Sequence, residues 1–138
     1  APYIEKSDIK SKGRIVIGTI YGDTHDIGKN IVSLILNGSG FDVLDLGRDI
    51  SAERFIDEAV KFDADIIAMS TIMTTTMNNM KSIIDLLEKR GLRDNFKVII
   101  GGKPCSLGFA RKIGADDYSA SATGALRLVK KIINKQKD

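Results

Sequence analysis

Residues 14–28 read RIVIGTIYGDTHDIG, a β-branched run followed by a glycine-containing loop and the start of a helix. The run over 14–20 has no helical period, which favours a buried parallel strand. The loop holds His25, the only histidine of the chain. Open α/β folds bind ligands in loops that leave the carboxyl end of a strand and lead into a helix. We therefore predict that His25 belongs to a ligand site.

Strand and helix patterns alternate from this segment to the end of the chain. Further apolar runs predict strands at 41–46, 65–70, 96–100 and 116–119. Helical spacing and capping residues predict helices at 28–36, 52–60, 77–90, 106–113 and 122–133. This order predicts an α/β fold, a Rossmann-like (flavodoxin-like) five-stranded parallel sheet with helices on both faces. In the first helix, Ile31, Leu34 and Ile35 are expected to face inward.

Composition limits the class of protein. The 138 residues are 43% hydrophobic and 28% charged, which fits one globular domain. The net charge of +3 is gathered near the ends and no apolar run could span a membrane, so neither nucleic acid nor membrane is an expected partner. The single cysteine, Cys105, suits a reducing compartment, the cytoplasm. Residues 1–13 are expected to be a linker or tail before a domain over 14–138, as in a fragment of a longer protein.

Four loops are expected to meet at one edge of the sheet. They cover 21–27, 71–76, 101–106 and 119–123. The first holds the histidine and two aspartates, the second is dense in hydroxyl groups, the third opens with paired glycines, and the fourth has only small residues. Together they predict a deep slot for a large, partly polar ligand. Close approach of that ligand to the backbone is expected at Gly18, Gly22 and Gly28.

Several common chemistries do not fit these loops. Cys105 lies in the third loop but has no second histidine to activate it as a nucleophile. One histidine and one cysteine cannot form a tetrahedral zinc site without several carboxylates. A single histidine does suit a metal already held by a macrocycle, because such a metal needs only one axial ligand from the protein.

Three motifs at the expected strand ends resemble those of a known family. The segment GDTHDIGKN, residues 22–30, resembles the cobalamin-binding signature Asp-x-His-x-x-Gly of methyl-carrying corrinoid proteins and of the methionine synthase cobalamin domain. Ser70-Thr71-Ile72 is similar to the family's Ser-x-Leu element, with Ile in place of Leu. Gly101-Gly102 is similar to its Gly-Gly element. The resemblance covers about residues 14–135.

The resemblance implies cobalamin as the cofactor and a role for each matching residue. His25 would be the lower axial ligand to cobalt, in place of the cofactor's own dimethylbenzimidazole. Asp23 would accept the other imidazole N–H, and the hydroxyl of Thr76 could complete a His–Asp–hydroxyl relay. The hydroxyl groups of Ser70 and Thr74 would hydrogen-bond the displaced nucleotide tail, which would pass the paired glycines and end near a small residue. The implied cofactor-binding set is Gly22, Asp23, Thr24, His25, Asp26, Ile27, Gly28, Ser70, Ile72, Thr74, Thr76, Gly101, Gly102 and Ala122.

The function that the resemblance implies is that of a methyl carrier. Cobalt would shuttle a methyl group between a methyl-donor methyltransferase and a methyl-acceptor methyltransferase, and a corrinoid reductive activator would be a further partner. The chain would then not be an enzyme by itself. The alternatives are the cobalamin-binding subunit of an adenosylcobalamin mutase and a cobalamin sensor module. A flavodoxin-like FMN protein is disfavoured because the slot offers only Tyr21 and Tyr118 for stacking. The sequence does not identify the methyl donor.

Overall fold

The computed structural model describes residues 11–137, and this part of the chain contains one five-stranded parallel sheet. Its strands are β1 (Arg14–Thr19), β2 (Asp42–Asp45), β3 (Ile66–Ser70), β4 (Lys97–Gly101) and β5 (Asp117–Ser119). Their order is β2-β1-β3-β4-β5, the flavodoxin-like order of doubly wound folds. The predicted fold class is therefore confirmed. Most of the expected linker at 1–13 lies outside the described residues.

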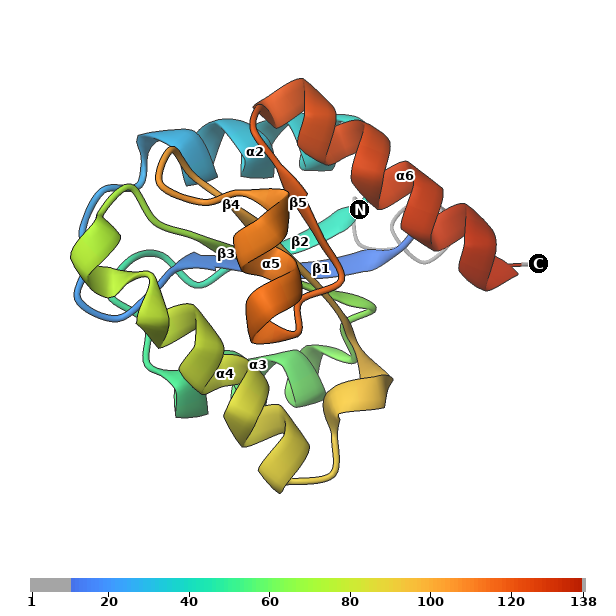
Figure 1. Ribbon diagram of the computed structural model, residues 1–138. Helices are drawn as coiled ribbons and strands as arrows, with labels where there is room; N and C mark the ends of the chain where they lie inside the picture. The colour runs from blue at the N-terminus through green and yellow to red at the C-terminus, as the bar shows by residue number, and fades with distance from the viewer. Residues whose placement is uncertain (1–10, 138) are drawn as a thin grey trace.

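Helices cover both faces of the sheet (Figure 1). One face carries α2 (Ile27–Gly38) and α6 (Ala122–Lys137). The other carries α3 (Ala52–Phe62), α4 (Asn78–Lys89) and α5 (Leu107–Ile113). Two short 3-10 helices, η1 (Thr74–Thr76) and η2 (Arg93–Asn95), precede α4 and β4. Within the described residues, none of the helices combines the length and the apolar character needed to cross a bilayer.

Serine caps fix the start of two helices as the sequence predicts. The Oγ atom of Ser51 accepts a hydrogen bond from the N–H of Arg54 at 3.2 Å, at the start of α3. The Oγ atom of Ser106 accepts one from the N–H of Phe109 at 3.0 Å, at the start of α5. Each bond satisfies a backbone donor that has no partner inside its helix.

The carboxyl ends of four strands lie level at one edge of the sheet. Thr19 pairs with Ser70, Ser70 with Gly101, and Gly101 with Ser119. The loops that follow these residues therefore begin side by side. This register confirms that the four loops identified in the sequence meet at one edge.

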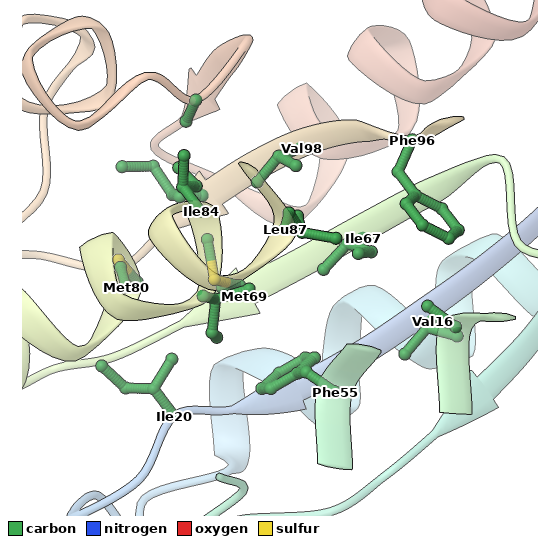
Figure 2. Packing of buried hydrophobic residues seen from close by; sticks show 14 of the residues in the cluster. Val16, Ile20, Phe55, Ile67, Met69, Met80, Ile84, Leu87, Phe96 and Val98 are labelled. Atoms are coloured by element: carbon green, nitrogen blue, oxygen red, sulfur yellow. The ribbon is translucent and has the colours of Figure 1, made fainter. Parts of the chain in front are cut away.

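The larger hydrophobic core lies between the sheet and α3, α4 and α5 (Figure 2). Its side chains include Ile67 and Met69 from β3, Phe55 from α3 and Leu87 from α4, all of them buried. A Cβ atom on Gly18 would lie 2.8 Å from Cζ of Phe55. The group that approaches the backbone at Gly18 is thus a core phenyl ring, and the expectation of a ligand there is wrong.

Helix α2 presents a different face to the sheet from the one expected. Ile31 is 47% exposed and Leu34 is 73% exposed, so the prediction that they face inward is wrong. Ile35 is half-buried. On α3, Val60 also keeps the apolar spacing but is exposed.

A buried lysine explains the orientation of α2. The buried positions of this helix are Lys29, Ser33 and Leu36, which lie on one face. The Nζ atom of Lys29 donates to Oδ1 and Oδ2 of Asp45 at 2.6 and 2.8 Å. Apolar spacing alone misplaces the helix because the carboxylate that allows the ammonium group to be buried lies on β2, far from Lys29 in sequence.

Candidate functional site

A cavity of about 420 Å³ lies at the level edge of the sheet. Its walls come from the ends of β3, β4 and β5, from the loop before α2, and from α2 and α6. Small and hydroxyl-bearing residues dominate the walls that the loops supply. A slot in this place is what the loop composition predicts. The residues that line it are Ile17, His25, Gly28, Lys29, Val32, Ala68, Met69, Ser70, Thr71, Ile72, Ile99, Ile100, Gly101, Gly102, Lys103, Ser119, Ala120, Ser121, Ala122 and Ala125.

His25 lies at the wall of this cavity, held by one of its two ring nitrogens. Its Nδ1 atom is 2.8 Å from Oδ1 of Asp23, and its backbone N–H donates to the same oxygen at 2.8 Å. The backbone oxygen of His25 accepts a hydrogen bond from the hydroxyl of Thr19 at 3.2 Å. The His25 side chain is 56% exposed. The loop is therefore fixed while Nε2 stays available to a ligand.

Asp23 is a fully buried carboxylate with four donors around it. Its Oδ2 atom accepts from the hydroxyl of Thr71 at 2.5 Å and from the N–H of Ile72 at 2.9 Å, and Oδ1 accepts from His25. Burial alone would raise the pKa of Asp23. The hydrogen bonds from Thr71, from the backbone of His25 and Ile72, and from the His25 ring together outweigh burial and lower this pKa from 3.8 to about 2.

The hydroxyl that touches Asp23 belongs to Thr71, not to Thr76 as the sequence-based relay has it. The Oγ1 atoms of Thr71 and Thr76 are 2.7 Å apart, and because Thr71 donates its one hydroxyl proton to Asp23, the bond between them uses the proton of Thr76. The alternative acceptor for that proton is the backbone oxygen of Met73, at 3.1 Å. Thr76 is thus the next member of the chain of hydrogen bonds. The chain of hydrogen-bond contacts joins four residues, His25, Asp23, Thr71 and Thr76.

The structure brings half of the expected cofactor-binding residues to the cavity wall. Those that line it are His25, Gly28, Ser70, Ile72, Gly101, Gly102 and Ala122. Asp23 and Thr76 lie behind the wall, and Thr74 is exposed on η1 outside the cavity. The remaining residues, Gly22, Thr24, Asp26 and Ile27, belong to the loop that carries His25 and to the start of α2, but they do not line the cavity.

Position 102 lines the cavity and must also be glycine for a structural reason. Its φ angle is +120°, and a Cβ atom there would lie 1.7 Å from the backbone oxygen of Thr71. The loops after β3 and β4 therefore approach each other more closely than any other residue would permit. Gly102 therefore lets these two loops pack at the cavity wall.

Sequence reasoning missed two side chains of this site. Thr71 was treated only as part of a hydroxyl-dense loop, although its position next to the strand end is the signal that could have identified it. Lys29 lines the cavity with its stem while its ammonium group is bonded to Asp45. The only charged residue of this helix, in its first turn, was the available signal.

Among the described residues, no group of three or more His, Cys, Asp or Glu side chains gathers to form a metal site. The family model of the B12 binding domain matches residues 13–134 of the chain. The chain belongs to the B12-binding domain family. Cobalamin, the expected cofactor, is confirmed by this membership.

The relatives of this B12-binding domain include several corrinoid proteins. It is 49% identical over 121 residues to the dimethylamine corrinoid protein of Methanosarcina barkeri, covering 88% of this chain and 57% of the relative. The structure of the monomethylamine corrinoid protein of the same organism aligns with a TM-score of 0.85 and 34% identity, over 95% of this chain and 62% of that one. A chain of the methanol:cobalamin methyltransferase complex MtaBC, also from Methanosarcina barkeri, aligns with a TM-score of 0.87 and 32% identity, over 96% of this chain and 52% of that one.

These relatives are longer proteins. The domain spans a little over half of the length of most of them.

The residues present fit the cofactor. A neutral imidazole tied at Nδ1 to a carboxylate leaves Nε2 as a metal ligand, and the adjacent cavity has the small and hydroxyl-bearing wall that a partly polar tail requires.

Proposed function

We propose that this B12-binding domain holds cobalamin with Nε2 of His25 as the lower axial ligand to cobalt and acts as a methyl carrier. The observation that supports the proposal most directly is the bond between Nδ1 of His25 and the buried Asp23 carboxylate, 2.8 Å long, beside the cavity. Bound cobalamin would supply a metal centre that accepts and releases a methyl group.

In this proposal, Asp23 fixes both the orientation and the tautomer of His25. Its carboxylate is ionised at neutral pH because its pKa is about 2, so Oδ1 can only accept hydrogen bonds. The ring proton of neutral His25 therefore lies on Nδ1, and the lone pair of Nε2 is free for a metal. Thr71 and Thr76 extend the chain of hydrogen bonds from Asp23. A change in the protonation of His25 would therefore alter the hydrogen bonds as far as Thr76.

The cavity would take the nucleotide tail of the cofactor. Ser70 offers a hydroxyl at the cavity wall, and its Oγ atom lies 3.3 Å from the hydroxyl of Thr19. Gly101, Gly102 and Ala122 provide walls without bulky side chains. Since Thr74 lies outside the cavity, we propose that the tail contacts Ser70 and not Thr74.

Three exposed apolar side chains lie near His25 in the sequence or line the same cavity. Tyr21, Ile27 and Ile72 are all exposed, and Ile72 donates its backbone N–H to Asp23. We propose that these side chains contact the corrin ring or a protein that docks over it, because exposed apolar groups beside a ligand site commonly serve such contacts.

The proposed partners are a methyl-donor methyltransferase, a methyl-acceptor methyltransferase and a corrinoid reductive activator. The corrinoid protein names of the relatives and the methyltransferase complex that contains one of them support this reading. Cys105 is buried and its pKa is raised to about 11, so it offers no nucleophile for a reaction of the domain alone. We propose the cytoplasm as its location, in keeping with its single reduced thiol.

Reconstitution with cobalamin tests the axial ligand. The wild-type domain should bind cobalamin with the absorption and EPR signature of an axial imidazole nitrogen. His25→Gly should lose that signature and regain it when free imidazole is added. Because the chain has one histidine, ¹⁵N-labelling of histidine should change the nitrogen splitting of the wild-type EPR signal, and an unchanged splitting would disprove the assignment.

Methyl donors test the carrier function. The cobalamin-loaded, reduced domain is mixed with methylamines, methanol or methoxylated aromatics, first alone and then with a methyltransferase that uses the same donor. Methylation of the cofactor is expected only in the second mixture. Rapid methylation in the first mixture would mean that the domain is itself an enzyme.

A further inference from the structure

The loop between β2 and α3 runs beside the loop that carries His25 and holds its backbone. The N–H of Gly22 donates to Oδ1 of Asp49 at 2.8 Å, and the N–H of Asp49 donates to the backbone oxygen of Asp23 at 3.0 Å. One Nη atom of Arg48 lies 3.3 Å from the backbone oxygen of Thr24. Two adjacent residues thus hold three successive residues of the histidine loop.

Asp49 has an unusual backbone conformation. Its φ angle is 58°, and among the described residues only one other non-glycine residue, Asp63, has a positive φ, of 57°. Asp63 ends α3, where a left-handed residue is common. Asp49 ends no helix, and glycine would adopt its conformation more easily. Glycine, however, has no carboxylate to accept the N–H of Gly22.

The neighbours of Asp49 tie the same two loops together. The N–H of Thr19 donates to the backbone oxygen of Gly47 at 2.9 Å, and the N–H of Ile50 donates to the backbone oxygen of Thr19 at 3.0 Å. Ile20 and Ile50 form an isolated parallel bridge. The segment from Gly47 to Ile50 is therefore anchored to the end of β1 on both sides of Asp49.

These contacts fix Asp23 from two directions. Asp49 and its neighbours hold the backbone on either side of Asp23, while Thr71 and Ile72 hold its carboxylate from the loop after β3. With both sets of bonds in place, Oδ1 of Asp23 accepts the backbone N–H of His25 and lies 2.8 Å from its ring Nδ1.

We propose that Asp49 is a positioning residue for His25: through Gly22 and Asp23 it sets the orientation of the imidazole that the proposed function places on cobalt. The inference rests on that function for its consequence, but the orientation of His25 can be measured without cofactor. Asp49 itself faces Gly22 and Asp23 and does not line the cavity, so it acts through these residues and not on the cofactor.

The test compares four variants of the cofactor-free domain labelled with ¹⁵N-histidine, whose single histidine gives one unambiguous set of signals. Asp49→Asn keeps an acceptor oxygen and tolerates a left-handed backbone, so it should match the wild type. Asp49→Gly keeps the left-handed backbone conformation but loses the acceptor oxygen. Asp49→Ala loses the acceptor oxygen and also disfavours the left-handed conformation. In both, the exchange rate of the His25 amide should rise by about tenfold or more, and the ring signal of Nδ1 should shift. Asp63→Gly changes the other left-handed aspartate and should leave His25 unchanged.

An unchanged His25 amide and ring in Asp49→Gly would overturn the proposal, and so would an equal effect of Asp63→Gly or loss of order in Asp49→Asn. Asp49→Gly carries the test if Asp49→Ala fails to fold. After loading with cobalamin, Asp49→Gly should show a weaker axial-nitrogen signature than the wild type, and Asp49→Asn a normal one. If the wild-type domain lacks this signature, the proposed function fails, while the result on the cofactor-free domain still decides the role of Asp49.

Discussion

A hydrogen bond joins the side chains of Asp23 and His25, one of which is buried and the other exposed. The Asp23 carboxylate is fully buried, the His25 side chain is 56% exposed, and their Oδ1 and Nδ1 atoms are 2.8 Å apart. A buried acceptor with fixed donors cannot turn to follow the ring, so the ring must follow the carboxylate. This relationship gives an exposed side chain the fixed orientation that a metal ligand needs.

Acidification should weaken the folded state through Asp23. Its pKa is about 2 in the folded domain against an ordinary value of 3.8, so its contribution is fully present above about pH 4 and is lost as pH falls toward 2. The contribution is about 2 kcal/mol. We therefore expect the wild-type domain to have a larger free energy of unfolding in urea than Asp23→Asn. This difference should shrink as the pH falls from 5 to 2.5. The other carboxylates are present in both proteins, so their pH-dependent contributions cancel in this difference. A difference independent of pH would contradict the depressed pKa.

Removal of the Thr71 hydroxyl should destabilise the domain and disturb Asp23. Thr71→Val keeps the shape of the side chain but leaves Oδ2 of Asp23 with one donor, the N–H of Ile72. We expect a loss of about 1–3 kcal/mol in the free energy of unfolding and a higher pKa of Asp23. Thr71→Ser, which keeps the hydroxyl, should retain the low pKa. Thr75→Val, an exposed threonine of the same run, is the control and should change neither quantity. Equal effects of the two valine variants would show that the hydroxyl of Thr71 has no special role.

Gly102→Ala should be among the most damaging single substitutions. The new Cβ atom would meet the backbone oxygen of Thr71, and the φ angle of +120° is strained for alanine. We expect the free energy of unfolding to fall by about 4 kcal/mol or more, seen as a lower urea midpoint or as failure to fold. Gly38→Ala has no heavy atom within 4 Å of its Cβ and should be tolerated. A Gly102→Ala protein with the stability of Gly38→Ala would mean that the two loops can separate at little cost.

The two halves of the Lys29–Asp45 pair should respond unequally to substitution. The Lys29 side chain is 2% exposed, whereas that of Asp45 is 32% exposed. Asp45→Asn leaves a buried ammonium group without its counter-charge and should cost about 3 kcal/mol. Lys29→Met removes the buried charge and leaves a carboxylate that water can reach, so it should cost about 1–2 kcal/mol. The double variant should be close to Lys29→Met in a urea titration. A larger loss for Lys29→Met than for Asp45→Asn would argue against this account.

Cys105 should be unreactive in the folded domain. The thiol is buried beside Met80, and burial raises its pKa from 9.0 to about 11. A disulfide reagent at pH 8 should label one thiol in denaturant and almost none in its absence. The raised pKa stabilises the folded state below pH 9, and this contribution is lost as pH rises from 9 toward 11. The stability advantage over Cys105→Ala should shrink over that range. Rapid labelling of the native protein would show that the thiol is accessible.

The sequence alone determined the fold class, the edge at which the loops meet, and the identity of the central histidine. It could do so because these features depend on local signals, such as β-branched runs, serine caps and the glycines that end strands. The pairing of Asp23 with His25 was also predictable, since only Thr24 separates them in one loop.

Other features depend on residues distant in sequence, and only the tertiary structure decided them. The rotation of α2 follows from a carboxylate on another strand, and the hydroxyl on Asp23 comes from Thr71, which lies 48 residues away. The role of Asp49 depends on a backbone conformation and on two bonds to a loop 27 residues earlier. The physical reason is the same in each case: a buried polar group must find its partner in space, and sequence spacing does not indicate where that partner lies.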